Sequence, residues 1–487
     1  MKIKVAGFNV DIELLTEAAE YLTEGDASAL TPETISAAYA RISRDPRSVD
    51  QLRADAIRDV TKARASNEQI VFGMGHASVA EHAVFNFDIM GVSRLAIEAI
   101  EHARLCSYTE KSQRYIKLKD DFVIPEEIIE AGFESQFREL VTKQHAAYQV
   151  LFEGIRDHLL AKQPEATKEE RKAIDGKAKE DARYVTSLAV EGQLGMTSNA
   201  RNLEHMIRRL LCHPLHEVKA IGALLYSEAK QIAPSLLRYL EPTSAQLQAM
   251  TDLRALAIEM TKEESHTFTE PVCLLEWDPD ADDNVMAALL HTQTGIGLTE
   301  CQHCWRHMEI KQGKRLVRAV FTGLQQWDSL PREFELADFL FDLTISASCF
   351  AQLKRHRMAT ILPQAYNPVL GYTTPPSVQE VGLEDAFQEV MFASTSMYHD
   401  LVQCGLPLVA PYVLTQAHRR RVLVKMNARE LYHFSRMRQD GHAQWDIREI
   451  ANRMVGIAKR VCPLTMSLAC GKDVFEQRKV ALLEKMI

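Results

Sequence analysis

A short polar segment in the first half of the chain, Ser107 to Tyr115, holds residues suited to bind a charged ligand. It follows the cationic end of an expected helix, and Glu110, Ser112 and Arg114 stand at alternate positions within it. Arginine offers a two-pronged donor to phosphate, while serine hydroxyls and backbone N–H groups complete the shell of such an anion. The segment therefore suits a phosphorylated or heterocyclic ligand, although a solvated polar loop would have the same composition.

The second half carries a different cationic motif, the run K-R-H-R at 354–357, at the end of an apolar helix. Positive charge at a helix C-terminus compensates the helix dipole, but this effect is worth only about 0.3–1 kcal/mol. Two arginines on either side of an imidazole favour a pyrophosphate or flavin contact over a simple cap. Farther on, Arg438 and His442 lie around an expected helix break, where backbone N–H groups can face a ligand.

Two clusters of histidine and cysteine have the residue types of a metal site but not its spacing. His76 and His82 lie six residues apart (82 − 76), whereas ligands on one helix face stand four apart. Cys301 and Cys304 form a C-x-x-C next to His303 and His307, a spacing that can ligate zinc, but the chain has no second C-x-x-C. We expect hydrogen-bonded histidines and packed thiols here, with zinc at the cysteine pair as the alternative.

The two halves of the chain repeat one another. The pattern N-A-R-x-L-x-H occurs at 199–205 and again at 427–433, a shift of 228 (427 − 199). Residues 122–125 correspond to 372–375 at a shift of 250 (372 − 122), and Ser93 with Arg104 corresponds to Ser346 with Arg357 at a shift of 253 (346 − 93). Shifts this similar indicate a duplicated domain, with 22 extra residues (250 − 228) in the first copy. The charged run at 162–179 is the candidate insertion, expected to be a solvated helix.

The elements that must position these residues also repeat. Alternating apolar residues predict a strand over 85–89 and another over 339–345, and in each copy a serine, Ser93 or Ser346, then opens a helix with a cationic end near Arg104 or Arg357. Asn199 and Asn427 are expected N-caps, with Glu430 completing a capping box and Gly441 ending that helix. A long helix is expected over 445–461. The predicted domains are 1–243, a helical linker over 244–272, and 273–487.

Composition narrows the class of protein. A chain of 487 residues suits two domains. The net charge of −9 argues against a general nucleic-acid or membrane binder, because such surfaces need an excess of basic residues. Nine scattered cysteines, the absence of an apolar signal-peptide core and the absence of an apolar run near about 20 residues indicate reduced thiols in a cytoplasmic protein.

Taken together, the motifs resemble those of the flavin-dependent thymidylate synthases. The family signature is R-H-R, seven residues, Ser, one residue, then Arg-Tyr, with H-x-[ST]-x-x-E-H upstream and N-A-R and H-A-Q-W downstream. The first copy matches the outer parts of the signature, at His76, Ser78, Glu81, His82, Ser112, Arg114 and Tyr115, but its R-H-R has become His102-Ala103-Arg104. The second copy has the complete R-H-R at 355–357, whereas Ala365 and Asn367 replace the following Ser and Arg.

The same division continues downstream. The first copy has Arg183, similar to a nucleotide-contacting arginine of the family, but Leu210 and Pro214 where an Arg and the His of H-A-Q-W belong. The second copy has Pro411 near the position of Arg183, and keeps Arg438 and the run 442–445. Because the losses are reciprocal, the two copies together still hold one full set of motif residues.

The resemblance implies a fold and a division of labour. It implies a mixed α/β (α+β) fold with two tandem domains, each a twisted, mainly antiparallel sheet packed with helices, and a homodimer forming a pseudo-tetramer. It implies that the nucleotide dUMP is held by Glu110, Ser112, Arg114, Arg183 and Arg438, with Arg438 and Ser112 catalytic. It implies that FAD is held by His76, Ser78, Arg355, His356, Arg357, Asn427, Arg429 and His442.

The implied reaction is the reductive methylation of dUMP to dTMP, with methylenetetrahydrofolate as carbon donor, reduced FAD as hydride donor and NADPH as the reductant. None of the nine cysteines needs a catalytic role in it, and Cys106 is expected to be a buried structural thiol. Two alternatives stay open: a flavoprotein that acts on a pyrimidine nucleotide with a different reaction or carbon donor, and a non-catalytic nucleotide-binding relative.

Overall fold

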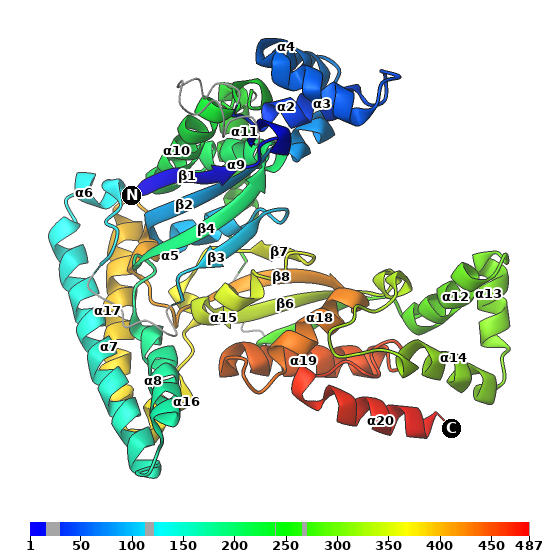
Figure 1. Cartoon of the computed structure of the whole chain (residues 1–487). Coiled ribbons are helices and arrows are strands. Elements are labelled where there is room, and N and C mark those ends of the chain that lie inside the picture. The colour runs from blue at the N-terminus through cyan, green and yellow to red at the C-terminus, as the bar shows by residue number, and fades with distance from the viewer. Residues whose placement is uncertain (16–29, 113–120, 239, 265–269, 487) are drawn as a thin grey trace.

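The computed structural model describes residues 1–15, 30–112, 121–238, 240–264 and 270–486. It contains two four-stranded antiparallel sheets, one from each half of the sequence, with helices packed around them (Figure 1). The expected mixed fold of two tandem, mainly antiparallel domains is therefore confirmed.

The two sheets have the same strand order. The first runs β1-β2-β4-β3, from strands Lys2–Phe8, Val84–Ser93, Glu191–Asn199 and Ser107–Glu110. The second runs β5-β6-β8-β7, from Val272–Trp277, Asp338–Ser346, Arg419–Asn427 and Thr360–Pro363. Ser93 pairs with Glu191, and Ser346 pairs with Arg419 at the equivalent positions of the second sheet. A bulge at Gly91, whose φ of 70° favours glycine, shifts the rest of the first ladder.

Equivalent helices surround the sheets. The first copy has α2 Glu33–Arg41, α3 Val49–Arg58, α4 Val60–Asn67, α5 Arg94–Glu101, α6 Glu126–Glu130, α7 Glu134–Lys162, α8 Lys168–Ala182, α9 Ala200–Leu211 and α10 His216–Ile232. After α11 Ser244–Met260, the second has α12 Ala281–Gln293, α13 Leu298–Arg306, α14 Ile310–Thr322, α15 Ala347–Leu353, α16 Pro376–Glu380, α17 Glu384–Gln403, α18 Ala428–Arg438, α19 Trp445–Val461 and α20 Phe475–Lys485. The expected charged insertion is α8, and the linker helix α11 buries none of its residues.

The two copies pack around an approximate two-fold axis. The amide of Leu188 donates to Leu414 O at 2.9 Å, and that of Gln416 donates to Thr186 O at 3.0 Å. These two bonds are symmetry mates, because the shift of 228 carries residue 186 to 414 and residue 188 to 416. Helices α7 and α17 lie side by side (Figure 1), and Gln144 donates to Ser394 Oγ at 2.9 Å. Those two residues are equivalent as well (394 − 144 = 250). The chain therefore folds as an internal dimer with a self-complementary interface.

The cores of the copies are continuous across this axis. The apolar cluster under the first sheet includes Met397, Leu401 and Tyr412 from the second copy. A further cluster joins α7 and α8 to α17. Because apolar side chains of both copies are removed from water together, separating the copies would expose core residues of each.

Several local expectations are confirmed and others are wrong. Ser93, Ser346, Asn199 and Asn427 each cap their helix through a side-chain oxygen. However, part of the predicted polar loop, Ser107–Glu110, is strand β3, and the helix after Ser346 ends at Leu353 rather than near Arg357. Gly441 does not end α18, because that helix stops at Arg438 with Gln439 as C-cap. The helix predicted over 445–461 is α19, and helix α20 follows it. None of the described helices is long and apolar enough to cross a membrane.

Candidate active site at the junction of the two copies

The cationic run of the second copy faces the first copy. Lys354 Nζ lies 2.7 Å from Glu101 Oε2, and these side chains are only 5% and 6% exposed. The two residues are equivalent positions (354 − 101 = 253), so this ion pair stands on the approximate two-fold axis. A symmetric homodimer would bring two identical side chains together there, whereas the duplicated chain brings opposite charges. The C-terminal ends of α5 and α15 are thereby held together.

Glu110, predicted to hold a nucleotide, lies at the centre of a cationic cluster drawn from both copies. Arg94 Nη1 lies 3.0 Å from Glu110 Oε1, with both side chains buried, and Arg355 Nη2 lies 3.7 Å from Oε2. Burial alone would raise the pKa of Glu110, but the positive charges of Lys354, Arg94, Arg355 and Arg183 lower it below its ordinary value. Glu110 is therefore an anion that keeps several guanidinium groups close together.

Arg438 and His356, both predicted site residues, are joined directly. Arg438 Nε lies 3.0 Å from His356 Nε2, and the other Arg438 nitrogens donate to the Oε1 and backbone O of Gln352, each at 3.1 Å. Arginine can only donate, so His356 Nε2 accepts and its proton is on Nδ1, which faces Glu430 Oε1 at 3.3 Å. Burial, together with the charges of Arg438 and His433, lowers the pKa of His356 well below 6.5. The imidazole is therefore neutral.

The side chain of Glu430 does not form the expected capping box. The backbone N–H of Glu430 donates to Asn427 Oδ1 as expected of an N-cap, but the carboxylate turns to His356. Burial raises the pKa of Glu430. The carboxylate of Glu430 therefore orients the imidazole of the R-H-R motif.

The remaining motif residues near the junction are partly placed. Arg357 donates to the backbone carbonyl of Cys106 in the first copy, and the Cys106 thiol is buried, 3.3 Å from Ser198 Oγ. Ser112 lies two residues after Glu110, the last residue of β3. Arg114 lies outside the described residues. Arg183 begins a short helix over 183–185 and is buried.

Two residues that motif reasoning missed belong to this junction. Arg94 lies buried directly after the Ser93 cap, and Gln352 holds Arg438 from α15. Among the described residues, Arg94 Nε and Nη2, Gln352 Nε2 and Glu110 Oε2 are buried without a hydrogen-bond partner. Such atoms are costly unless a ligand or water meets them. The signal available in the sequence was a long polar side chain within each of two short, mainly apolar helices.

Other predicted flavin residues make local contacts. His76 Nε2 lies 3.2 Å from Arg44, and Ser78 lies in the short helix Ala77–His82 that follows. Arg429 donates to Leu330 O at 2.7 Å and pairs with Glu335 at 3.0 Å. The His442 side chain is 91% exposed and contacts Asp440 at 2.9 Å. These contacts, and the N-cap role of Asn427, do not join the residues to the Glu110 cluster.

The H-A-Q-W segment also ties the copies together. Gln444 Nε2 donates to the Tyr184 hydroxyl at 2.6 Å, and Trp445 stacks on the Tyr184 ring with 5.7 Å between ring centroids. Trp445 Nε1 donates to Asp181 Oδ1 at 2.8 Å. Because Tyr184 follows Arg183 directly, this docking fixes the backbone that carries a predicted nucleotide contact.

The cysteine pair of the second copy lies on α13. It is distant in sequence from the junction residues. Cys301 is buried and Cys304 is exposed, while the rings of His303 and His307 stack with centroids 4.1 Å apart. Among the described residues, no group of three or more His, Cys, Asp or Glu side chains could hold a metal ion.

The duplicated fold and the polar junction define a chain of two related domains that meet through charged and polar side chains. The family model described as "Thymidylate synthase complementing protein" matches residues 27–235 and 274–464, so the chain belongs to this family, that of the flavin-dependent thymidylate synthases. The resemblance seen in the motifs is thereby confirmed for both copies.

The relatives fall into two kinds. A UPF0159 protein of Chlamydia pneumoniae is 25% identical over 82% of this chain and 78% of its own length. A UPF0159 protein of Thermoplasma acidophilum is 23% identical over 81% of this chain and 86% of its own length. The flavin-dependent thymidylate synthase of Clostridium tetani is 30% identical over 44% of this chain and 83% of its own length. The chain is therefore similar over most of its length to the first kind, and over about half of it to the second.

Proposed function

We propose that the chain is a flavin-dependent thymidylate synthase that converts dUMP to dTMP with methylenetetrahydrofolate and reduced FAD, using NADPH as the reductant. The observation that carries the proposal is the Glu110 cluster, in which Glu110 and Arg94 of the first copy meet Arg355 of the second. Residues that the sequence divides between two incomplete copies thus lie at one junction. Reciprocal loss of motif residues is what selection for a single working site would leave.

The chemistry of the junction suits an anionic nucleotide. The positive charges of Arg94, Arg183 and Arg355 act on Glu110, Arg438 is held by Gln352 and His356, and buried donors of Arg94 and Gln352 lack partners among the described residues. A nucleotide phosphate and the uracil carbonyls are acceptors that would meet such donors. Ser112, which follows Glu110 by two residues, would add a hydroxyl, and Arg114 beyond it a further guanidinium.

The chain activates the pyrimidine by electrostatics. Arg438, fixed by Gln352 and His356, presents a permanent positive charge to charge that develops on the ring, the principle of an oxyanion hole. Because it cannot titrate, that charge is present at every working pH. Ser112 is the second proposed catalytic group. When bound, FAD would supply the hydride, and methylenetetrahydrofolate the carbon.

The donor set also fits a flavin. Arg355 lies beside Glu110, and His356 and Arg357 follow it in the chain, with the imidazole held as the Nδ1–H tautomer by Arg438. His76, Ser78, Asn427, Arg429 and His442 would complete the flavin shell from other surfaces. Because their contacts within one chain are local, we propose that a homodimer, arranged as a pseudo-tetramer, brings them to it. We propose 1–243 and 273–487 as the two domains, joined by 244–272.

Flavin uptake is the first test. Purified full-length protein is mixed with FAD, passed through a desalting column, and the bound flavin is quantified by absorbance. We expect a yellow complex with FAD retained in proportion to the chain, and Arg355→Ala should lower the affinity. Arg138→Ala, which removes an exposed arginine on α7, is the matched control and should bind normally. Wild-type protein without retained FAD would refute the flavin site.

The reaction is tested separately. Release of tritium from [5-³H]dUMP is measured with the FAD-loaded protein, NADPH and methylenetetrahydrofolate, and dTMP is quantified by chromatography. We expect both products. Arg114→Ala should abolish dUMP binding but leave FAD bound, because its side chain belongs to the first-copy motif alone. FAD-loaded protein that binds dUMP without forming dTMP would favour a different reaction on a pyrimidine nucleotide, whereas loss of dUMP binding as well would refute the nucleotide site.

A further inference from the structure

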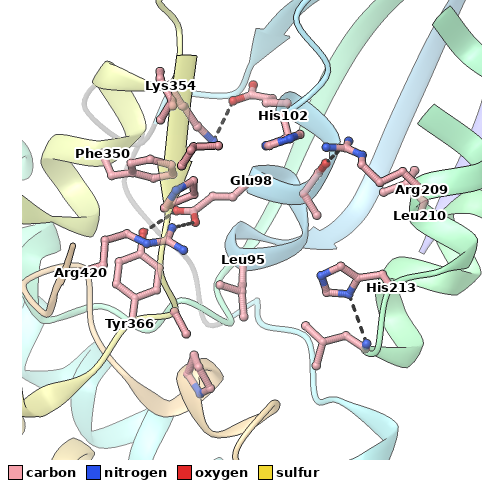
Figure 2. A pocket seen from close by; sticks show the side chains of 18 of the residues that line it. Leu95, Glu98, His102, Arg209, Leu210, His213, Phe350, Lys354, Tyr366 and Arg420 are labelled. Atoms are coloured by element: carbon pink, nitrogen blue, oxygen red, sulfur yellow. Dashed lines mark hydrogen bonds and ion pairs between the residues drawn. The ribbon is translucent and has the colours of Figure 1, made fainter. Parts of the chain in front are cut away.

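A cavity of about 680 Å³ lies at the position that the approximate two-fold symmetry relates to the candidate active site (Figure 2). The shift of 253 relates Ala99, His102, Pro363 and Ala365 to Gln352, Arg355, Glu110 and Ser112. The shift of 228 relates Leu210, Pro214 and Pro411 to Arg438, His442 and Arg183. The lining of the cavity includes Ala99, His102, Pro363, Ala365, Leu210, Pro214 and Pro411. Positions where the two copies departed from the motif therefore meet in one place, beside Lys354, His356 and Arg357 of the intact run, which also line the cavity.

The substitutions make the lining of this cavity more apolar than the equivalent part of the intact junction. Arg438, Arg183 and Glu110 are replaced by Leu210, Pro411 and Pro363, so two guanidinium groups and a carboxylate are missing. Further apolar residues of the lining, among them Leu95, Leu215, Ile361, Leu362 and Leu408, extend the same surface. A volume of this size is typical of sites for small organic molecules, which are mostly apolar with few polar groups.

The acidic side chains of the cavity are neutralised by partners. Glu98 pairs with Arg420 at 2.7 Å and accepts from the Tyr366 hydroxyl at 2.7 Å, and Figure 2 shows this group on one wall. Glu101 is paired with Lys354. The carboxylates therefore leave little net negative charge to repel an anion.

Cationic groups remain, and some are new relative to the other copy. Arg104 and Arg254 line the cavity, and neither makes an ion pair with the residues the structure describes. Arg209 donates to Ala99 O at 2.6 Å on the wall opposite Arg420 (Figure 2). Arg209 and His213 correspond to Met437 and Gly441 (437 − 209 = 228 and 441 − 213 = 228). Arginine and histidine therefore stand in an otherwise apolar lining at positions where the intact junction has neither.

We propose that this cavity is a second small-molecule site, specific for a molecule with an apolar body and one acidic group. The apolar body would replace water against the Leu210, Pro411 and Ala365 side, where polar ligands find no partners. The acidic group would face Arg104, Arg209 and Arg254. The site rests on the shape and charge of the cavity and not on the proposed reaction. It differs from the intact junction, because it lacks the counterparts of Arg438 and Arg183, which are proposed to hold the nucleotide there.

The probe is 1-anilinonaphthalene-8-sulfonate, which has an aromatic body and one sulfonate. Binding to the full-length protein is measured by isothermal titration calorimetry, with FAD and dUMP present in excess so that sites for those ligands are filled. We expect one probe molecule per chain. N-phenyl-1-naphthylamine, the same body without the sulfonate, should bind about tenfold more weakly, equivalent to roughly 1.4 kcal/mol. Equal binding of the two probes would overturn the assignment of the cations.

Variants locate the bound probe. Ala365→Trp adds bulk at an exposed residue of the lining, so it should weaken probe binding at least about tenfold while the protein stays folded. Arg104→Glu, also at an exposed position, should weaken the sulfonate probe but leave N-phenyl-1-naphthylamine unchanged. Ala173→Trp, on the exposed side of α8, is the control for an added tryptophan. Absence of stoichiometric probe binding, or binding that Ala365→Trp leaves unchanged, would overturn the proposal, whatever the protein does with FAD and dUMP.

Discussion

The Lys354–Glu101 ion pair on the two-fold axis gives the sharpest test of the internal dimer. Lys354→Met keeps much of the side-chain volume but leaves the Glu101 carboxylate buried, with a side chain 6% exposed, without its partner. Removing one member of a buried pair costs about 3–5 kcal/mol, because the remaining charge loses its compensation. Glu101→Gln should cost less than this, because the ammonium group of Lys354 keeps the attraction of Glu110.

The charge swap Glu101→Lys with Lys354→Glu separates the pair from its surroundings. The two residues end equivalent helices, so exchanging them moves the cation from the end of α15 to the end of α5. The helix-dipole terms, each about 0.3–1 kcal/mol, then largely cancel. The swap does lose the attraction between Lys354 and Glu110, so recovery will be incomplete. We expect a favourable coupling energy of about 2–3 kcal/mol, near the top of the range for residues in contact.

The assay is urea unfolding followed by tryptophan fluorescence and circular dichroism, with protein concentration held constant. Both single charge reversals should lower the midpoint strongly, and the double variant should recover more than half of the loss. The reasoning would be refuted if Lys354→Met cost less than about 0.5 kcal/mol, the range of ordinary surface substitutions. A double variant no more stable than the singles would show that the two side chains do not meet.

Three further predictions concern buried polar groups. Burial lowers the pKa of His418 to about 3 and that of His356 well below 6.5, so the unfolded chain binds more protons than the folded one below pH 6.5. The free energy of unfolding should therefore fall on acidification from pH 6.5 towards 3, and His418 alone should account for about 2 kcal/mol of the loss at pH 5. In His418→Gln, the urea midpoint should depend less on pH than in the wild type. Gln144→Leu should cost about 1–3 kcal/mol in urea unfolding, since Ser394 Oγ and Val413 O lose a buried donor. Arg438→Lys, which cannot reproduce the three bonds to His356 and Gln352, should lower kcat for dTMP formation at least about tenfold with little change in urea midpoint; unchanged kcat would count against its catalytic role.

Local features of the fold were predictable because their causes are local. The serine caps at Ser93 and Ser346 and the asparagine caps at Asn199 and Asn427 bond to amides three residues ahead, so the sequence alone identifies them. Strand Ser107–Glu110 was not predicted, because it exists only by pairing with Met196 and its neighbours in β4, far along the chain. The early end of α15 at Leu353 has the same kind of cause, since Lys354 turns to Glu101 of the other copy.

Recognition of the site had a similar limit. Glu110, Arg355, His356 and Arg438 were predicted from motifs, and the structure brings Arg355 to Glu110 and Arg438 to His356. Arg94 and Gln352 were missed, because neither stands in a motif and their roles depend on Glu110 and Arg438 approaching from other elements. The motifs also assigned Arg355 to the flavin alone, whereas its position beside Glu110 places it near the proposed nucleotide as well, so Arg355→Ala is expected to weaken both ligands.

The sequence by itself determined the duplication, the family and the reciprocal loss of motif residues, because these are patterns of residue type and spacing. Only the tertiary structure decided which residues of one copy face which of the other. The two-fold axis through Gln144 and Ser394, and through Glu101 and Lys354, pairs the intact half of one motif with the intact half of the other. By the same symmetry it gathers the altered positions into one cavity, which Lys354, His356 and Arg357 of the intact run also line. Long-range packing sets that geometry, and no local pattern records it.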